Sequence, residues 1–113
     1  MKYFIDYKEL PKNHSSFHEF YKGKWDEKTF WNRDSIYIHD DYLFYANGLV
    51  EAISTFCPEY NPYGETTITG MDWAKIGNIV NQKDDLSKQL YAEISQWLSS
   101  VFPEHGCFTI LGI

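Results

Sequence analysis

The sequence predicts an α+β fold, with a sheet of about four strands and helices packed on one face, in a single small domain over residues 1–113. Short runs of aromatic and β-branched residues, typical of strands, alternate with segments whose apolar residues recur every three or four positions, as in amphipathic helices. The sequence contains no internal repeat and no Gly/Ser-rich or Pro-rich linker. A chain of 113 residues can form one hydrophobic core without a metal or a disulfide.

Four segments are short and rich in aromatic or β-branched residues, the composition that strands favour. We predict strands over residues 3–7, 35–38, 65–69 and 107–111. Pro11 follows the first segment and Gly106 precedes the last, and both residue types interrupt regular structure. The spacing between the segments permits parallel or antiparallel pairing, so the strand order stays open.

A short helix is predicted over residues 17–22. Ser16 and Glu19 have the spacing of a capping box, in which each side chain accepts a hydrogen bond from the other residue's backbone. Gly23 would end this helix. Residues 24–33 mix aromatic and charged side chains without a clear period, and we predict an irregular segment or one helical turn.

Residues 40–56 allow two interpretations. Asn47-Gly48 is a strong hairpin signal, whereas the apolar residues recur at helical spacing. These apolar residues are Tyr42, Ala46, Leu49, Val50, Ile53 and Phe56. We favour a helix, because the second half of the segment does not alternate as a strand would. Asp40 or Asp41 would cap it, and Gly48 would cost about 1 kcal/mol in its interior.

The C-terminal half is predicted to contain a loop and two further helices. Residues 57–64 hold two prolines and are predicted as a loop. Asp72 is predicted to cap the next helix, and Asp84 or Asp85 to cap a longer one that Pro103 closes. One apolar stripe runs along this longer helix, formed by Leu86, Leu90, Ile94, Trp97, Leu98 and Val101.

Charge is distributed unevenly along the sequence. The chain has a net charge of −6 and a single arginine, which argues against nucleic-acid binding, since phosphate contacts rely on Lys and Arg. The forty-one residues from Asp34 to Ala74 include no Lys or Arg, but they include seven acidic and eight aromatic residues. This cation-free segment is therefore a candidate for a binding surface.

A helical wheel of residues 40–56 places Tyr42, Ala46, Leu49 and Ile53 toward the core and Phe44 on the opposite side. Exposed aromatic rings beside carboxylates are typical of protein interfaces that attract a basic partner. The candidate partner-binding residues are Asp40, Asp41, Phe44, Glu51, Glu59, Tyr60 and Glu65. The equally weighted alternative is that the acids only keep the domain soluble and the aromatic rings are buried.

The sequence shows no catalytic, metal or cofactor motif. His14 and His18 have the i, i+4 spacing of two metal ligands, but structural zinc needs four ligands and only these two can be nominated. Cys57 and Cys107 form no C-x-x-C motif and are predicted to be buried thiols. We expect no catalytic residue, no metal ligand and no cofactor; a small enzyme of unknown chemistry is the third-ranked alternative.

Residues 35–76 combine the strand at 35–38, an amphipathic helix, and the motifs Tyr63-Gly64-Glu65-Thr66-Thr67-Ile68 and Asp72-Trp73-Ala74-Lys75-Ile76. This arrangement resembles small immunity proteins of bacterial polymorphic-toxin and contact-dependent growth inhibition systems. The resemblance implies a cytoplasmic, non-catalytic protein that binds and neutralises a cognate toxin domain, typically a nuclease with a basic groove. The competing interpretation is a scaffold or interaction domain with no toxin partner.

No segment of the sequence has the apolar length of a signal peptide core or of a membrane span. We therefore expect a cytoplasmic location and no membrane partner. The seven candidate residues are those through which we expect the toxin domain to bind.

Overall fold

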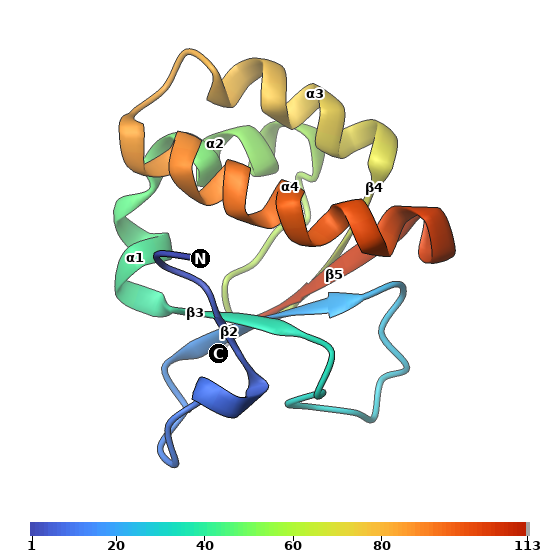
Figure 1. Cartoon of the computed structure of the whole chain (residues 1–113). Helices are drawn as coiled ribbons and strands as arrows, with labels where there is room; N and C mark the ends of the chain where they lie inside the picture. The colour runs from blue at the N-terminus through green and yellow to red at the C-terminus, as the bar shows by residue number, and fades with distance from the viewer. Residues whose placement is uncertain (113) are drawn as a thin grey trace.

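The computed structural model describes residues 1–112 and shows an antiparallel five-stranded sheet with helices on one face (Figure 1). The strands are β1 (Ile5–Asp6), β2 (Phe17–Lys22), β3 (Ile36–His39), β4 (Glu65–Thr69) and β5 (Cys107–Leu111). The helices are α1 (Asp40–Tyr45), α2 (Asn47–Phe56), α3 (Gly70–Val80) and α4 (Asp85–His105), with a 3-10 turn η1 (Tyr7–Glu9) after β1. The predicted α+β fold is confirmed, with one strand more than expected.

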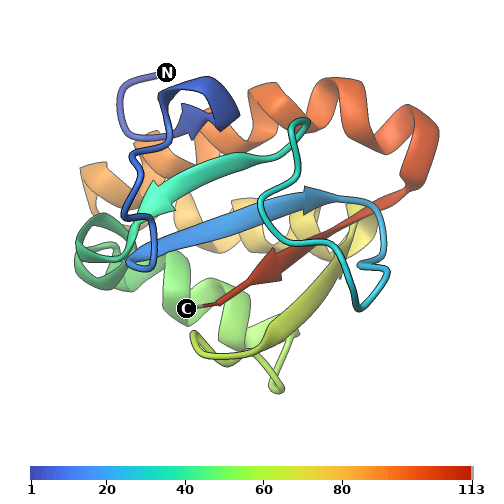
Figure 2. The same cartoon turned by 90° about the horizontal axis from the view of Figure 1, so that it is seen from below.

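The strand order is β1-β3-β2-β5-β4, and every neighbouring pair is antiparallel. β5 lies between β2 and β4, because Leu111 is opposite Glu19 on one side and Glu65 on the other. The centre of the sheet therefore joins segments from opposite ends of the sequence. In Figure 2 the strands lie in front of the helices, which cover only the far face.

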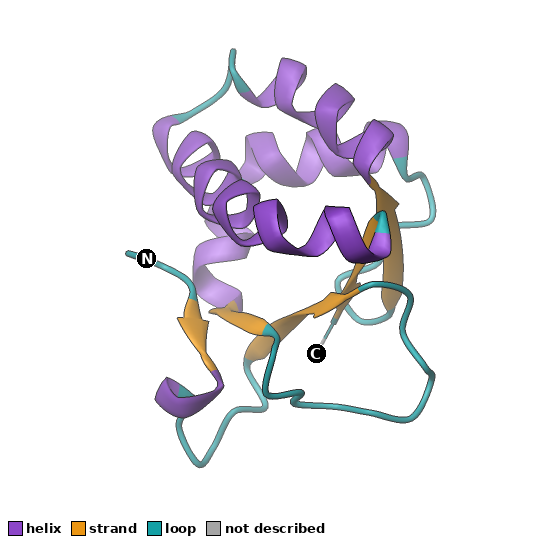
Figure 3. Cartoon of the chain, turned by 45° about the vertical axis from the view of Figure 1, so that its right-hand side comes forward, coloured by secondary structure: helices purple, strands orange, loops and turns teal. Residues whose placement is uncertain are grey.

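The core lies between the sheet and helices α2, α3 and α4, which stack above the strands in Figure 3. Phe108 on β5 is fully buried at the centre of an aromatic cluster. Its ring lies 6.0 Å from Phe20, 5.4 Å from Trp73, 6.1 Å from Trp97 and 6.2 Å from Phe102, measured between centroids. This cluster joins the two central strands to α3 and α4.

The long loop between β2 and β3 crosses the other face of the sheet (Figure 2). The buried carboxylate of Glu19 accepts hydrogen bonds from the backbone N–H of Trp31 (2.6 Å) and Asn32 (2.9 Å) and from the hydroxyl of Ser35 (2.6 Å). Trp31 then stacks on Tyr37, with centroids 5.9 Å apart. The carboxylate thus holds the loop against the sheet.

The predicted helix over residues 17–22 is wrong: these residues form β2. The spacing of Ser16 and Glu19 suggested a capping box, but Glu19 instead receives the hydrogen bonds of the loop that follows. A capping box is present between Asp6 and Glu9, at the 3-10 turn. Residues 24–33 are irregular, as predicted.

Residues 40–56 are helical and form no hairpin, which confirms the favoured interpretation, but they form two helices. The break lies at Ala46, whose φ of −84° and ψ of 61° are not helical. The break shifts the phase of the apolar stripe, so Leu43 is buried whereas Tyr42, predicted to face the core, is 44% exposed. His39 caps α1, in place of Asp40 or Asp41, by accepting the Asp41 N–H at its Nδ1 (3.1 Å).

The remaining caps agree with the predictions in part. Asp84 caps α4, as predicted, and accepts hydrogen bonds from the N–H and the hydroxyl of Ser87. Asp72 does not cap α3; its N–H donates to the Thr69 hydroxyl, so Thr69 is the cap. Pro103 does not close α4, because it lies in the last turn and the helix continues to a left-handed Gly106 (φ 70°). The predicted segments for β4 and β5 are confirmed.

Gly48 lies in the first turn of α2, packed against the residues that start α4. A Cβ added to Gly48 would lie 2.5 Å from the Lys83 Cβ and 2.6 Å from the Asp84 Oδ1. Gly48→Ala is therefore expected to lower the free energy of unfolding by about 1–3 kcal/mol through overpacking, although Ala favours helices over Gly. Urea denaturation of the two proteins measures the difference.

Gly70→Ala is the matched control, because Gly70 lies in the first turn of α3 and the nearest atom to its added Cβ is 3.7 Å away, on Phe102. This variant is expected to equal the parent or gain about 0.4–1 kcal/mol. A Gly48→Ala protein at least as stable as the parent would show that this close approach is unimportant.

Candidate functional site

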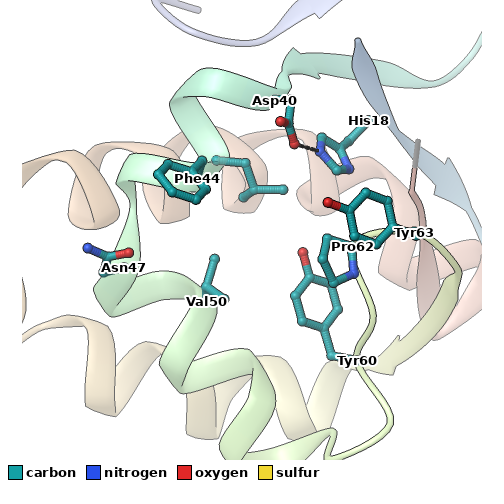
Figure 4. A pocket seen from close by; sticks show the side chains of 9 residues that line it. His18, Asp40, Phe44, Asn47, Val50, Tyr60, Pro62 and Tyr63 are labelled. Carbon is teal, nitrogen blue, oxygen red and sulfur yellow. Dashed lines mark hydrogen bonds and ion pairs between the residues drawn. The ribbon is translucent and has the colours of Figure 1, made fainter. Parts of the chain in front are cut away.

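Three of the seven predicted site residues, Asp40, Phe44 and Tyr60, line one pocket of about 290 Å³ (Figure 4). β2 contributes one wall, α1 and the start of α2 a second, and the loop between α2 and β4 a third. The lining residues are His18, Asp40, Leu43, Phe44, Asn47, Val50, Tyr60, Pro62 and Tyr63. The pocket is therefore built by segments distant in the sequence.

The polar wall of the pocket is an imidazole–carboxylate pair. His18 is fully buried, and its Nε2 lies 2.6 Å from the Oδ1 of Asp40, whose side chain is 39% exposed. The Asp40 N–H donates to the Ser16 carbonyl (2.8 Å), which fixes the start of α1 beside β2. The Nδ1 of His18 is buried and has no hydrogen-bond partner among residues 1–112.

Three aromatic side chains complete the lining, Phe44 from α1 and Tyr60 and Tyr63 from the loop between α2 and β4. Phe44 and Tyr63 are 69% and 75% exposed at the rim, and Tyr60 is half-buried. In Figure 4 the hydroxyls of Tyr60 and Tyr63 point into the pocket. Burial, together with the nearby charge of Asp40, raises the pKa of Tyr60 to about 12, so its hydroxyl is neutral at physiological pH. The predicted exposure of Phe44 is confirmed.

The other four predicted site residues lie outside the pocket. Asp41 lines a separate hollow beside Tyr42 and the N-terminal segment. Glu51 is exposed on α2, where Lys83 lies 3.4 Å from its carboxylate, so a cation from outside the cation-free segment pairs with it. Glu59 and Glu65 are exposed, in the loop and at the start of β4.

His18 was not predicted as a pocket residue, because the sequence placed it on a helix, where its spacing from His14 pointed to a metal ligand. The two histidines have separate partners: the His14 Nδ1 lies 3.0 Å from the Pro11 carbonyl, and its ring packs edge-on against Trp31. Within residues 1–112, no three His, Cys, Asp or Glu side chains are grouped so as to hold a metal ion. Tyr63, the most exposed aromatic residue of the rim, was not among the seven candidates.

Both cysteines are free thiols. Cys57 is buried, as predicted, whereas Cys107 is only partly buried. Burial, followed by the charges of Glu59 and Asp72, raises the pKa of Cys57 to about 11. Its sulfur is therefore protonated at neutral pH, a weak nucleophile.

Comparisons of this chain with protein-family models, with curated proteins and with solved structures found no match. The similarity to immunity proteins therefore stays a prediction. Among residues 1–112, no helix combines the length and the apolar character needed to cross a membrane. The pocket itself combines hydrogen-bond acceptors with exposed aromatic rings.

Proposed function

We propose that this protein is a non-catalytic, cytoplasmic immunity protein that binds and neutralises a cognate toxin domain, a nuclease with a basic groove. Binding uses the pocket face, defined here by Asp40, Phe44, Tyr60 and Tyr63. The observation that carries the proposal is the position of Phe44 and Tyr63, two highly exposed rings at the rim of a pocket with a carboxylate in its wall. Aromatic residues so placed are enriched at protein interfaces.

The charge around the pocket favours a basic partner. Every lining residue except His18 comes from the cation-free segment Asp34 to Ala74. A partner rich in Lys and Arg therefore meets a carboxylate in the pocket wall and no Lys or Arg among the lining residues. The groove of a nuclease binds phosphates through Lys and Arg, so carboxylates can occupy the same positions. Complementary charge also speeds association at low ionic strength.

Phe44 is the expected hot spot of the interface, because its ring is exposed in the free protein and would be covered in the complex. Phe44→Ala is expected to weaken binding of the cognate toxin domain by about 2–4 kcal/mol, which is roughly 30-fold to 1000-fold. Calorimetric titration measures the affinity, and co-expression with the toxin domain measures protection from growth arrest.

Phe30→Ala is the control for this prediction. Phe30 is 54% exposed but lies in the loop between β2 and β3, away from the residues that line the pocket. It should bind and protect as the parent does. Failure of the parent protein to bind or protect would contradict the function, and full binding by Phe44→Ala would contradict the proposed face.

A further inference from the structure

The His18–Asp40 pair leaves one atom of each residue without a hydrogen-bond partner among the described residues. The His18 Nε2 faces the Asp40 Oδ1 at 2.6 Å, and the buried Nδ1 of the same ring has no partner within residues 1–112. The Oδ2 of Asp40 accepts no hydrogen bond from the described residues, so it remains available to a ligand in the pocket.

The rest of the pocket suits a flat cation. The hydroxyls of Tyr60 and Tyr63 point inward and can accept hydrogen bonds (Figure 4). The rings of Phe44, Tyr60 and Tyr63 offer π faces, which attract cations. The volume of about 290 Å³ is at the lower limit for small-molecule sites, which fits one long side chain better than a nucleotide.

We propose that this pocket binds the guanidinium group of an arginine side chain presented by the partner protein. A guanidinium is planar, stacks on aromatic rings and presents five N–H donors in one plane, whereas the lysine ammonium presents three donors and has no face to stack. The pocket offers several acceptors and three rings, and so matches arginine. The identity of the partner rests on the proposed function, but the chemistry of the pocket does not.

The test is a titration with N-acetyl-arginine methylamide, followed by amide NMR shifts. N-acetyl-citrulline methylamide, of the same shape but uncharged, and N-acetyl-lysine methylamide are the comparison probes. We expect the arginine probe to bind with a Kd on the order of 1 mM, with shifts at Phe44, Tyr60 and Tyr63. The citrulline probe should bind at least tenfold more weakly and the lysine probe several-fold more weakly. Equal binding of all three would overturn the proposal.

Asp40→Asn and Asp41→Asn are the matched variants. Asp40→Asn keeps the shape and an oxygen for His18 but removes the charge, and should weaken arginine binding at least tenfold. Asp41 is adjacent in sequence but lies outside the pocket, so Asp41→Asn should bind as the parent does. If Asp40→Asn unfolds, the exposed Tyr63→Ala replaces it, with an expected fivefold loss. Unchanged binding by the variant used would overturn the proposal.

Toxin binding and arginine binding are measured separately, so either proposal can be refuted while the other holds. Arginine binding that depends on Asp40, without toxin binding, would support the pocket and refute the toxin as partner. Toxin binding that Asp40→Asn does not weaken, together with no arginine binding, would support the proposed function and refute the pocket. If both inferences hold, Asp40→Asn should weaken toxin binding and Asp41→Asn should not.

Discussion

Replacing Phe108 with alanine is expected to lower the free energy of unfolding by about 3–5 kcal/mol, the usual cost of removing a buried aromatic ring. The ring is fully buried and lies against four others, from β2, α3 and α4. Rigid elements on several sides cannot all move in to fill the cavity, so the cost should lie near the upper end. Because domains of this size are stable by only about 5–15 kcal/mol, the variant would be marginal at 37 °C.

Urea denaturation followed by tryptophan fluorescence measures this loss. Phe30→Ala removes the same ring from an exposed position, where Phe30 packs against Trp25, and should change stability by less than about 1 kcal/mol. A Phe108→Ala protein within 1 kcal/mol of the parent would mean that the aromatic cluster is not the centre of the core.

Glu19→Ala is expected to lower the free energy of unfolding by about 3 kcal/mol or more. The change removes the acceptor of two backbone N–H groups, at Trp31 and Asn32, and of the Ser35 hydroxyl. Each buried donor left without an acceptor costs about 1–3 kcal/mol, although water entering the site would recover part of this. Hydrogen exchange at Trp31 and Asn32 should also accelerate, because the loop loses its anchor.

Glu19→Gln is the matched control for length. Its amide keeps one acceptor oxygen but places an NH₂ group against a donor, so its loss of stability should be intermediate. We expect the free energy of unfolding to fall from the parent to Glu19→Gln and again to Glu19→Ala. Urea denaturation of the three proteins separates the contribution of the hydrogen bonds from that of the side-chain stem. Equal stability of the Gln variant and the parent would show that the second carboxylate oxygen contributes nothing.

The sequence correctly predicted the elements whose signals are local. β4 and β5 are short, β-branched or aromatic runs between turns, and their segments match the structure. Asp84 precedes an amphipathic stretch and caps α4. These features depend on neighbouring residues, so no distant contact is needed to find them.

β2 could not be predicted in this way, because both of its faces are covered. Phe20 lies in the core under the helices, and Glu19 lies under the loop on the opposite face. A strand covered on both faces shows no alternation of polar and apolar residues, so only the misleading spacing of Ser16 and Glu19 remained. The partners that make this segment a strand are β3 and β5, and β5 lies far away in the sequence.

The candidate site was predictable only in part, for a related reason. The absence of cations and the helical wheel singled out Asp40 and Phe44, since both arguments use residues close in sequence. Asp41 was included with Asp40, but successive helical residues point about 100° apart and Asp41 lies outside the pocket. His18 enters the pocket through the pairing of β2 with β3, which sequence spacing does not reveal.

The position of β5 has a consequence for biosynthesis. A nascent chain that has left the ribosome as far as β4 contains an open sheet edge on β2 and an unpaired strand, β4, whose shared partner follows later. Glu19 pairs with Leu111, so about ninety more residues are translated after Glu19 before β2 can pair with β5. Until then Phe20 has no cover from Phe108, and unpaired edges of this kind invite association between chains. Chaperone capture during translation would therefore act on β2 and β4 before β5 emerges.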